Sequence, residues 1–117
     1  MGNVSAHFSR WEFACRCGCG FDRVDPRLVS ILENVRRHFT APVTINSGCR
    51  CEAYNKKAGG VQNSQHVQGI AADIVVEGVK PALVASYLES QHPDCGIGRY
   101  NTFTHIDVRG YAARWKG

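Results

Sequence analysis

Two histidines and an aspartate stand at positions that suit a metal ion. His66 and Asp73 lie in the segment SQHVQGIAADI, and His105 lies in FTHIDVR. Two imidazoles and one carboxylate are a typical ligand set for catalytic zinc, and they leave a fourth position for water. Zinc in such a site polarises a carbonyl and lowers the pKa of its bound water. We therefore expect a small zinc hydrolase, against the alternative of ordinary histidines on a polar sheet face.

The side chain of Asp107 has three candidate roles near this site. It could accept a proton from a zinc-bound water, orient His105, or pair with Arg109, and we favour orientation or ion pairing. A general base must reach the water with a hydrogen bond. Tyr100 and Thr102 could hydrogen-bond the water or an oxyanion, but neither is a good base, since a phenol titrates near about 10.

Period-two alternation indicates how strands would present these side chains. The segments Ile70–Val76 and Thr104–Arg109 are rich in β-branched residues and read as strands. Asp73 then lies on one face of its strand, and His105 and Asp107 share a face of theirs. One sheet face can therefore present the carboxylate and the imidazole together, while His66 closes the site from the preceding loop.

The remaining elements are read from helix signals and short apolar runs. Asp25-Pro26 predicts the start of an amphipathic helix that ends before Ala41-Pro42, with Glu33 facing water. A second helix is predicted over Pro81–Gln91, with Leu83 among its inward residues. The other expected elements are strands at Val43–Asn46 and Gly96–Tyr100, helical turns at Cys51–Ala58, and a C-terminal loop, Gly110–Gly117, that packs Tyr111 and Trp115.

This order of elements predicts an α+β fold, a small antiparallel sheet flanked by helices. The strands Gly96–Tyr100 and Thr104–Arg109 should pair antiparallel through their short connection. The 117 residues suit a single domain, 1–117.

Four segments together resemble the M15 metallopeptidases, the D-Ala-D-Ala carboxypeptidase and Hedgehog-like family. They are Ser47-Gly48-Cys49-Arg50, the HxxGxAxD pattern from His66 to Asp73, GIGRY at 96–100, and FTHIDVR at 103–109. The resemblance extends from about Phe8 to Arg109. It implies the Hedgehog and D,D-peptidase fold, with Zn²⁺ bound by His66, Asp73 and His105.

The resemblance also assigns roles around the metal. Arg50 matches an arginine that holds a substrate carboxylate, which a guanidinium can grip with two hydrogen bonds. Ser64 and Tyr100 are candidate substrate-binding residues, although Ser64 could equally support its loop. Thr102 stands where the family usually has its catalytic carboxylate, so another group must act as the base, and Asp107 is the nearest candidate.

The implied function is zinc-dependent hydrolysis of amide bonds in peptidoglycan stem peptides. A D,D-carboxypeptidase or an endopeptidase, wall-lytic or wall-editing, of a bacterium or a phage would meet the description. The alternative is a non-catalytic, zinc-bearing binding or phage structural module of the same fold. A nucleic-acid binder built on cysteine-bound zinc is a weaker third reading, because it needs a continuous basic face.

Bulk properties narrow the setting. The net charge of +4 suits an anionic wall, but the basic residues are scattered, so we expect no nucleic-acid partner. The sequence contains no run of eighteen apolar residues, so we expect no membrane span, and no secretory signal is visible. We expect a monomer, made in the cytoplasm, that acts on the wall if it is released or exported. The six cysteines are compatible with free buried thiols, disulfides or a second metal.

Overall fold

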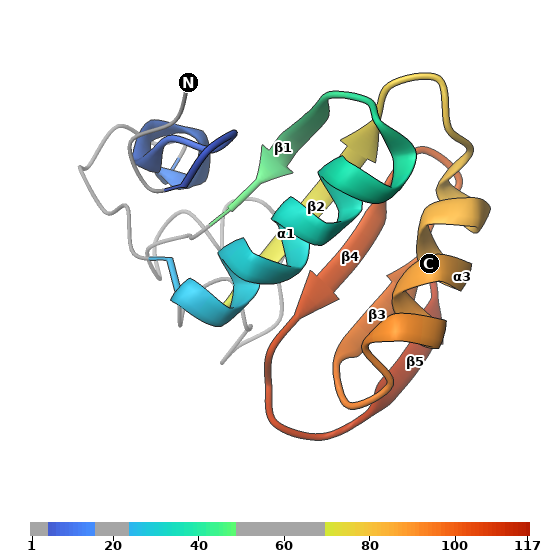
Figure 1. Ribbon diagram of the computed structural model, residues 1–117. Coiled ribbons are helices and arrows are strands. Elements are labelled where there is room, and N and C mark those ends of the chain that lie inside the picture. The colour runs from blue at the N-terminus through green and yellow to red at the C-terminus, as the bar shows by residue number, and fades with distance from the viewer. Residues whose placement is uncertain (1–4, 16–23, 49–69) are drawn as a thin grey trace.

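The computed structural model of the chain describes residues 5–15, 24–48 and 70–117, and these form an α+β structure (Figure 1). The elements, in chain order, are η1 (Arg10–Phe13), α1 (Pro26–Phe39), β1 (Val43–Ser47), β2 (Ala71–Val76), α3 (Pro81–Gln91), β3 (Gly96–Arg99), β4 (Thr104–Asp107) and β5 (Ala113–Lys116). The fold class read from the sequence is confirmed. The predicted turns at 51–58 lie outside the described residues.

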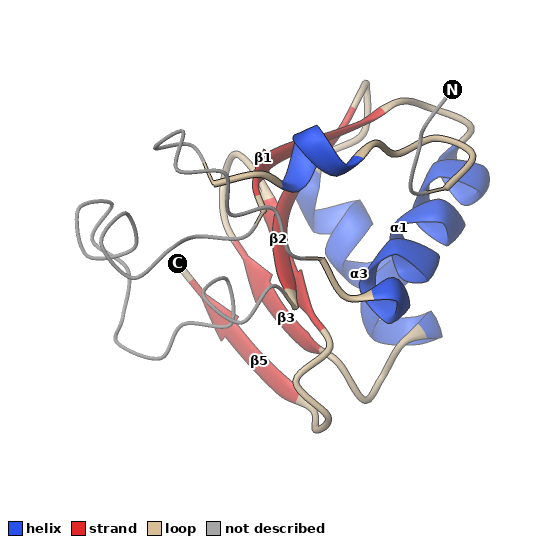
Figure 2. Cartoon of the chain, turned by 90° about the vertical axis from the view of Figure 1, so that its left-hand side faces the viewer, coloured by secondary structure: helices blue, strands red, loops and turns tan. Residues whose placement is uncertain are grey.

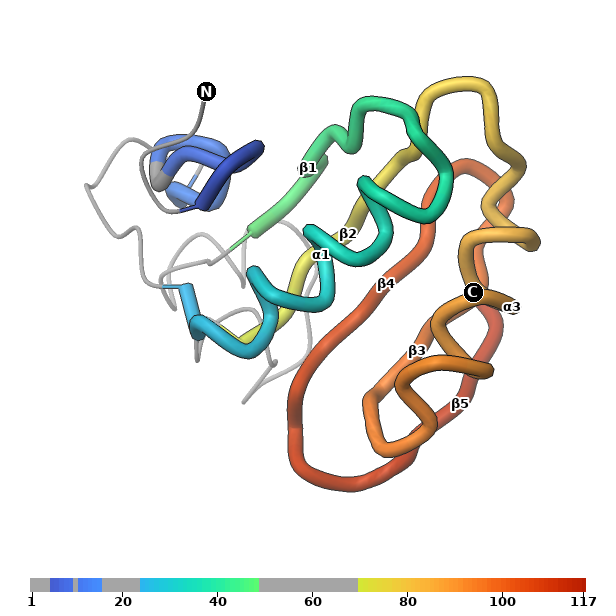
Figure 3. The backbone as a smooth tube through the Cα atoms, in the orientation of Figure 1, coloured from blue at the N-terminus to red at the C-terminus, as the bar shows by residue number. Residues whose placement is uncertain are grey.

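The five strands form one sheet in the order β1-β2-β4-β3-β5. All neighbours are antiparallel except β3 and β5, which are parallel. The predicted antiparallel pairing of β3 with β4 is confirmed. The chain trace in Figure 3 shows β2 and β4 side by side, and their register places Asp73 directly opposite His105. Strand β4 is thus paired on both edges.

Helices α1 and α3 lie on the same side of the sheet (Figure 2). The core between the layers contains Leu28 and Leu32 of α1, Ile74 of β2, Leu88 of α3 and Ile106 of β4, all at most 1% exposed. Because side chains alternate along a strand, the residues between these apolar ones point to the opposite face. That face carries Asp73 of β2 and both His105 and Asp107 of β4.

The start and the end of α1 follow from local chemistry. The carboxylate of Asp25 accepts a hydrogen bond from the backbone N–H of Arg27 at 2.8 Å, and Pro26 opens the helix with its φ already set. Thr40 ends the helix in the left-handed conformation, with φ of 50°. The predicted helix is confirmed.

Glu33, predicted to face water, is instead 7% exposed. Its carboxylate accepts hydrogen bonds from the hydroxyl of Ser5 and from the backbone N–H of His7 at 2.7 Å. The His7 ring lies 2.6 Å from its other oxygen. The N-terminal segment covers this part of α1, so the helix has a second buried side that helical periodicity did not reveal.

The C-terminal prediction was wrong in two respects. Residues 113–116 form β5 rather than a loop, and Tyr111 is 61% exposed rather than packed. The strand exists because it pairs with the edge of β3, a contact that local sequence does not announce. Leu83 was also misplaced: it is 57% exposed, and the buried side of α3 is made by Val84, Ala85 and Leu88.

In the described ranges, no helix combines the length and the apolar character that crossing a membrane requires.

Candidate functional site

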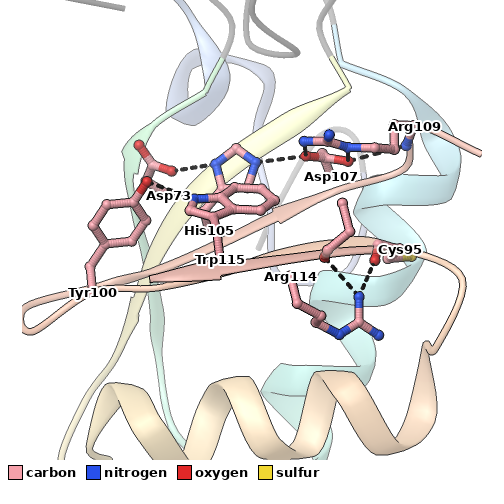
Figure 4. A network of polar contacts seen from close by, with 9 residues as sticks. Asp73, Cys95, Tyr100, His105, Asp107, Arg109, Arg114 and Trp115 are labelled. Carbon is pink, nitrogen blue, oxygen red and sulfur yellow. Dashed lines mark hydrogen bonds and ion pairs between the residues drawn. The ribbon is translucent and has the colours of Figure 1, made fainter. Parts of the chain in front are cut away.

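His105 lies between two carboxylates on the sheet face opposite the helices (Figure 4). Its Nδ1 is 2.9 Å from Oδ1 of Asp73, and its Nε2 is 2.7 Å from Oδ2 of Asp107. Asp73 reaches the ring because it is the direct cross-strand partner of His105, and such partners touch on one face. Asp107 reaches it because residues two apart on a strand share a face. The predicted juxtaposition of Asp73, His105 and Asp107 is therefore present.

Arg109 extends the contacts of His105 into a row of four side chains, Asp73, His105, Asp107 and Arg109. Its Nε donates to Oδ1 of Asp107 at 2.8 Å and its Nη2 donates to Oδ2 at 2.7 Å. Asp107 is fully buried. Burial alone would raise the pKa of this carboxyl group, but the hydrogen bonds from Arg109 and His105 outweigh it and hold the pKa far below its usual range. Asp107 is thus a carboxylate at neutral pH.

The ring of His105 responds to both carboxylates. Burial lowers the pKa of His105, whereas its hydrogen bonds to Asp107 and Asp73 raise it, and the net direction is upward. Without a metal, a proton on His105 therefore compensates part of the negative charge on either side. A cation beside Asp73 can take the place of that proton.

The pair Asp73 and His105 suits a zinc ion. Ligand atoms about 2 Å from a tetrahedral zinc lie roughly 3.3 Å apart, and the 2.9 Å between Asp73 Oδ1 and His105 Nδ1 is close to that separation. The opposite ring nitrogen contacts Asp107, as in the carboxylate–histidine–zinc arrangement that fixes a ligand's tautomer. These two side chains can hold zinc from the sheet.

The third predicted ligand, His66, lies outside the described residues, as do Arg50 and Ser64. Residues 5–15, 24–48 and 70–117 by themselves bring together no group of three or more His, Cys, Asp or Glu side chains suited to a metal. The site expected from the sequence therefore stays a prediction at these three positions.

A chain of aromatic contacts leads from the histidine through Trp115 and Tyr100 to Phe103. Tyr100 stacks on Phe103 with ring centroids 4.3 Å apart, and Trp115 is 5.0 Å from the ring of His105. The place of Trp115 at this site was not predicted. The only sequence signal for this placement was the alternation of residues 113–116, which puts Ala113 and Trp115 on the same face of a strand. Thr102 is exposed in the connection between β3 and β4.

Two glycines of β3 make room for these groups. A Cβ atom on Gly96 would lie 2.4 Å from Oδ1 of Asp107, and one on Gly98 would lie 2.5 Å from Nε1 of Trp115. The GIG sequence of β3 therefore alternates Ile97, which is in the core, with two glycines that lie close beneath the side chains of Asp107 and Trp115.

Gly48, in the segment that resembles the family's SGxR motif, has a similar packing role. A Cβ there would lie 2.5 Å from the Cα of Phe13, the fully buried last residue of η1. This close approach connects the N-terminal segment to the end of β1.

Cys95 is a buried free thiol, and burial raises its pKa. Cys15 is buried as well. The other four cysteines lie outside the described residues, so the alternatives for them stay open.

The sequence matches one known protein family over most of its length. No curated protein matches the chain. The sequence model of the Peptidase M15 family matches residues 6–107, a span that contains Asp73, His105 and Asp107. Because this span covers most of the 117 residues, the chain belongs to the peptidase M15 family.

Proposed function

We propose that the protein is a zinc-dependent peptidase that hydrolyses amide bonds in peptidoglycan stem peptides. Membership of the M15 family implies peptidase activity. The observation that carries the zinc dependence is the placement of His105, with one ring nitrogen toward Asp73 and the other toward the buried Asp107. This is the environment of a metal-ligating histidine.

In this proposal, His66, Asp73 and His105 hold the zinc. When bound, zinc supplies a Lewis acid for the scissile carbonyl and lowers the pKa of a coordinated water. Asp107 accepts a hydrogen bond from Nε2 of His105, which leaves Nδ1 unprotonated and aimed at Asp73. Arg109 keeps the carboxylate of Asp107 in place with two hydrogen bonds.

The contacts of Asp107 favour orientation over general base work. Each of its oxygens accepts a hydrogen bond from Arg109, and Oδ2 also contacts His105. Acting as a base would require a reachable lone pair on a side chain that is 0% exposed. Thr102, at the position of the family's usual carboxylate, supplies no base.

Substrate recognition rests on the predicted roles of Arg50, Ser64 and Tyr100. Arg50 would bind a carboxylate of the stem peptide bidentately, and Tyr100 and Ser64 would hydrogen-bond its amides. The net charge of +4 favours approach to the anionic wall once the protein is released or exported.

Digestion of purified peptidoglycan, followed by mass spectrometry of the products, tests this proposal. We expect release of terminal D-alanine from a D,D-carboxypeptidase, or cleaved cross-links or stem peptides from an endopeptidase. Chelation should abolish the release and added Zn²⁺ should restore it.

His105→Ala should be inactive and poor in zinc, whereas His38→Ala, a change at an exposed position of α1, should behave as the parent does. A parent protein that carries zinc and releases nothing from the wall would contradict the proposal and favour the non-catalytic binding module.

A further inference from the structure

The last strand brings an indole ring onto the histidine of the site. In the sheet, Gly98 of β3 is opposite His105 of β4 on one side and opposite Trp115 of β5 on the other. Because Gly98 has no side chain, the indole lies across this position, and its ring centroid reaches 5.0 Å from that of His105 at an angle of 54°. Strand β5 follows the segment matched by the family model, which ends at residue 107.

The same indole contacts the charged end of the row. The guanidinium carbon of Arg109 is 5.1 Å from the centroid of the Trp115 ring, within the range of a cation–π contact. Trp115 therefore covers both His105 and the arginine that anchors Asp107. Figure 4 shows Trp115 and Tyr100 on the same side of the strands as His105.

The hydrogen bond between Trp115 and Tyr100 has only one possible direction. Nε1 of Trp115 is 2.9 Å from the phenolic oxygen of Tyr100, and an indole N–H can only donate. The oxygen of Tyr100 is thus the acceptor, and its own proton must point elsewhere. In the part of the chain that the structure describes, no group accepts that proton.

The ring of Tyr100 is fixed from two further sides. It stacks on Phe103 with an interplanar angle of 13°. The backbone of Gly117 lies so close that a Cβ there would overlap the ring of Tyr100. The hydroxyl is therefore held in one place next to the indole that contacts His105, and it is a donor without an acceptor among the described residues.

From these contacts we propose that Trp115 is a positioning residue of the active site. It directs the hydroxyl proton of Tyr100 toward a carbonyl or carboxylate oxygen of the bound peptide. The inference rests on the proposed peptidase function and adds to it a residue beyond the family match. In this inference, the indole N–H of Trp115 orients the hydroxyl of Tyr100 toward the substrate, and the bulk of the ring is not required for this.

A double-mutant cycle of Trp115→Phe and Tyr100→Phe tests the inference in the full-length, zinc-loaded protein. Phe at 115 keeps an aromatic ring over Gly98 and removes the N–H. We expect each single change to lower kcat/KM on a stem pentapeptide ending in D-Ala-D-Ala by about 3- to 10-fold, the worth of one hydrogen bond. In the Tyr100→Phe background, Trp115→Phe should have almost no further effect, because the acceptor is already gone.

Two measurements separate positioning from packing. Zinc affinity, from competition with a chelator, should stay within about twofold of the parent in both single variants, because neither change removes a ligand. Trp11→Phe is the matched control, since Trp11 is 70% exposed on η1 and should affect nothing. Additive losses, an unchanged kcat/KM in Trp115→Phe, or a parallel fall in zinc affinity would each overturn the inference.

The same cycle distinguishes this inference from the proposed function. If the parent hydrolyses no wall peptide, the affinity of the zinc-loaded protein for the pentapeptide, measured by calorimetry, replaces kcat/KM. Coupled losses of affinity at Trp115 and Tyr100 would then support the positioning role while the peptidase proposal fails. A parent that does not bind the pentapeptide would overturn both.

Discussion

At the scale of single residues, Asp107 decides how the site is arranged. It is fully buried, and it joins the imidazole of His105 to the guanidinium of Arg109. A carboxylate in that place costs desolvation energy, which hydrogen bonds from both neighbours offset. Its contact with Nε2 holds the ring of His105 with Nδ1 toward Asp73, which is the orientation that the proposed zinc site needs.

Asp107→Asn should therefore weaken zinc binding. The amide keeps the shape but loses the charge, and it accepts hydrogen bonds through only one atom. We expect zinc affinity to fall by roughly 10-fold or more, as measured by chelator competition. Glu77→Gln, at an exposed turn, is the matched control and should have parent affinity.

The opposite outcome would reassign the residue. Unchanged zinc affinity with a loss of about 10²-fold in kcat would identify Asp107 as a general base rather than an orienting group.

The sequence was informative about residues whose spacing reflects a local rule. Strand alternation alone placed Asp73, His105 and Asp107 on shared faces, and the register of β2 and β4 bears this out. It could not place Trp115, because an indole reaches His105 only through the pairing of β5 with β3, across Gly98. Nor could it choose among the roles of Asp107, which depend on distances.

At the scale of elements, strand β3 acts as a platform. Gly96 and Gly98 lie on its site-facing side, under Asp107 and Trp115 respectively. The two positions share a strand and a face, so the same added methyl group at each should perturb a different part of the site.

Gly98→Ala and Gly96→Ala form this matched pair. The first should displace the indole of Trp115 and lower kcat/KM, while zinc affinity changes little. The second should displace the carboxylate of Asp107 and lower zinc affinity. Each should destabilise the fold by about 1–3 kcal/mol, the usual cost of overpacking, as measured by urea unfolding. If both variants bound zinc and turned over substrate like the parent, the close contacts under these side chains would be irrelevant to the site.

The helices were predictable because their signals are local, whereas β5 was not. Asp25-Pro26 and Pro81 open α1 and α3 at the positions read from the sequence. By contrast, residues 113–116 carry only a weak alternation, and the edge of β3 turns them into a strand. Leu83, in the first turn of α3, is exposed although the next residue, Val84, is buried, because the placement of the helix on the sheet decides which residues are covered.

At the scale of the whole molecule, Glu33 fastens the N-terminal segment to α1. Burial raises the pKa of this carboxyl group, but the hydrogen bonds from Ser5 and His7 outweigh it, and the net direction is downward. A pKa that is lower in the folded than in the unfolded state adds stability above the unfolded value of about 4.3, and this stability is lost as the pH falls through the folded value.

Glu33→Gln should remove this contribution. We expect a loss of about 1–3 kcal/mol in the free energy of unfolding at neutral pH, because donors of Ser5 and His7 lose a charged acceptor. The difference between parent and variant should shrink as the pH is lowered below about 4, and denaturant unfolding across pH measures it. A difference that is constant from neutral to acidic pH would show that the charge of Glu33 is not what fastens the segment.

The position of β4 in the middle of the sheet has a consequence for motion. His105 and Asp107 are paired through their backbone with both β2 and β3, so neither can leave its place by fraying of an edge. Exposing these amides to solvent requires separating β4 from a neighbouring strand inside the sheet, which is a larger opening than the fraying of an edge strand. His105, the proposed zinc ligand on β4, therefore belongs to a slowly exchanging part of the sheet, and the geometry around its ring persists for as long as the sheet stays folded.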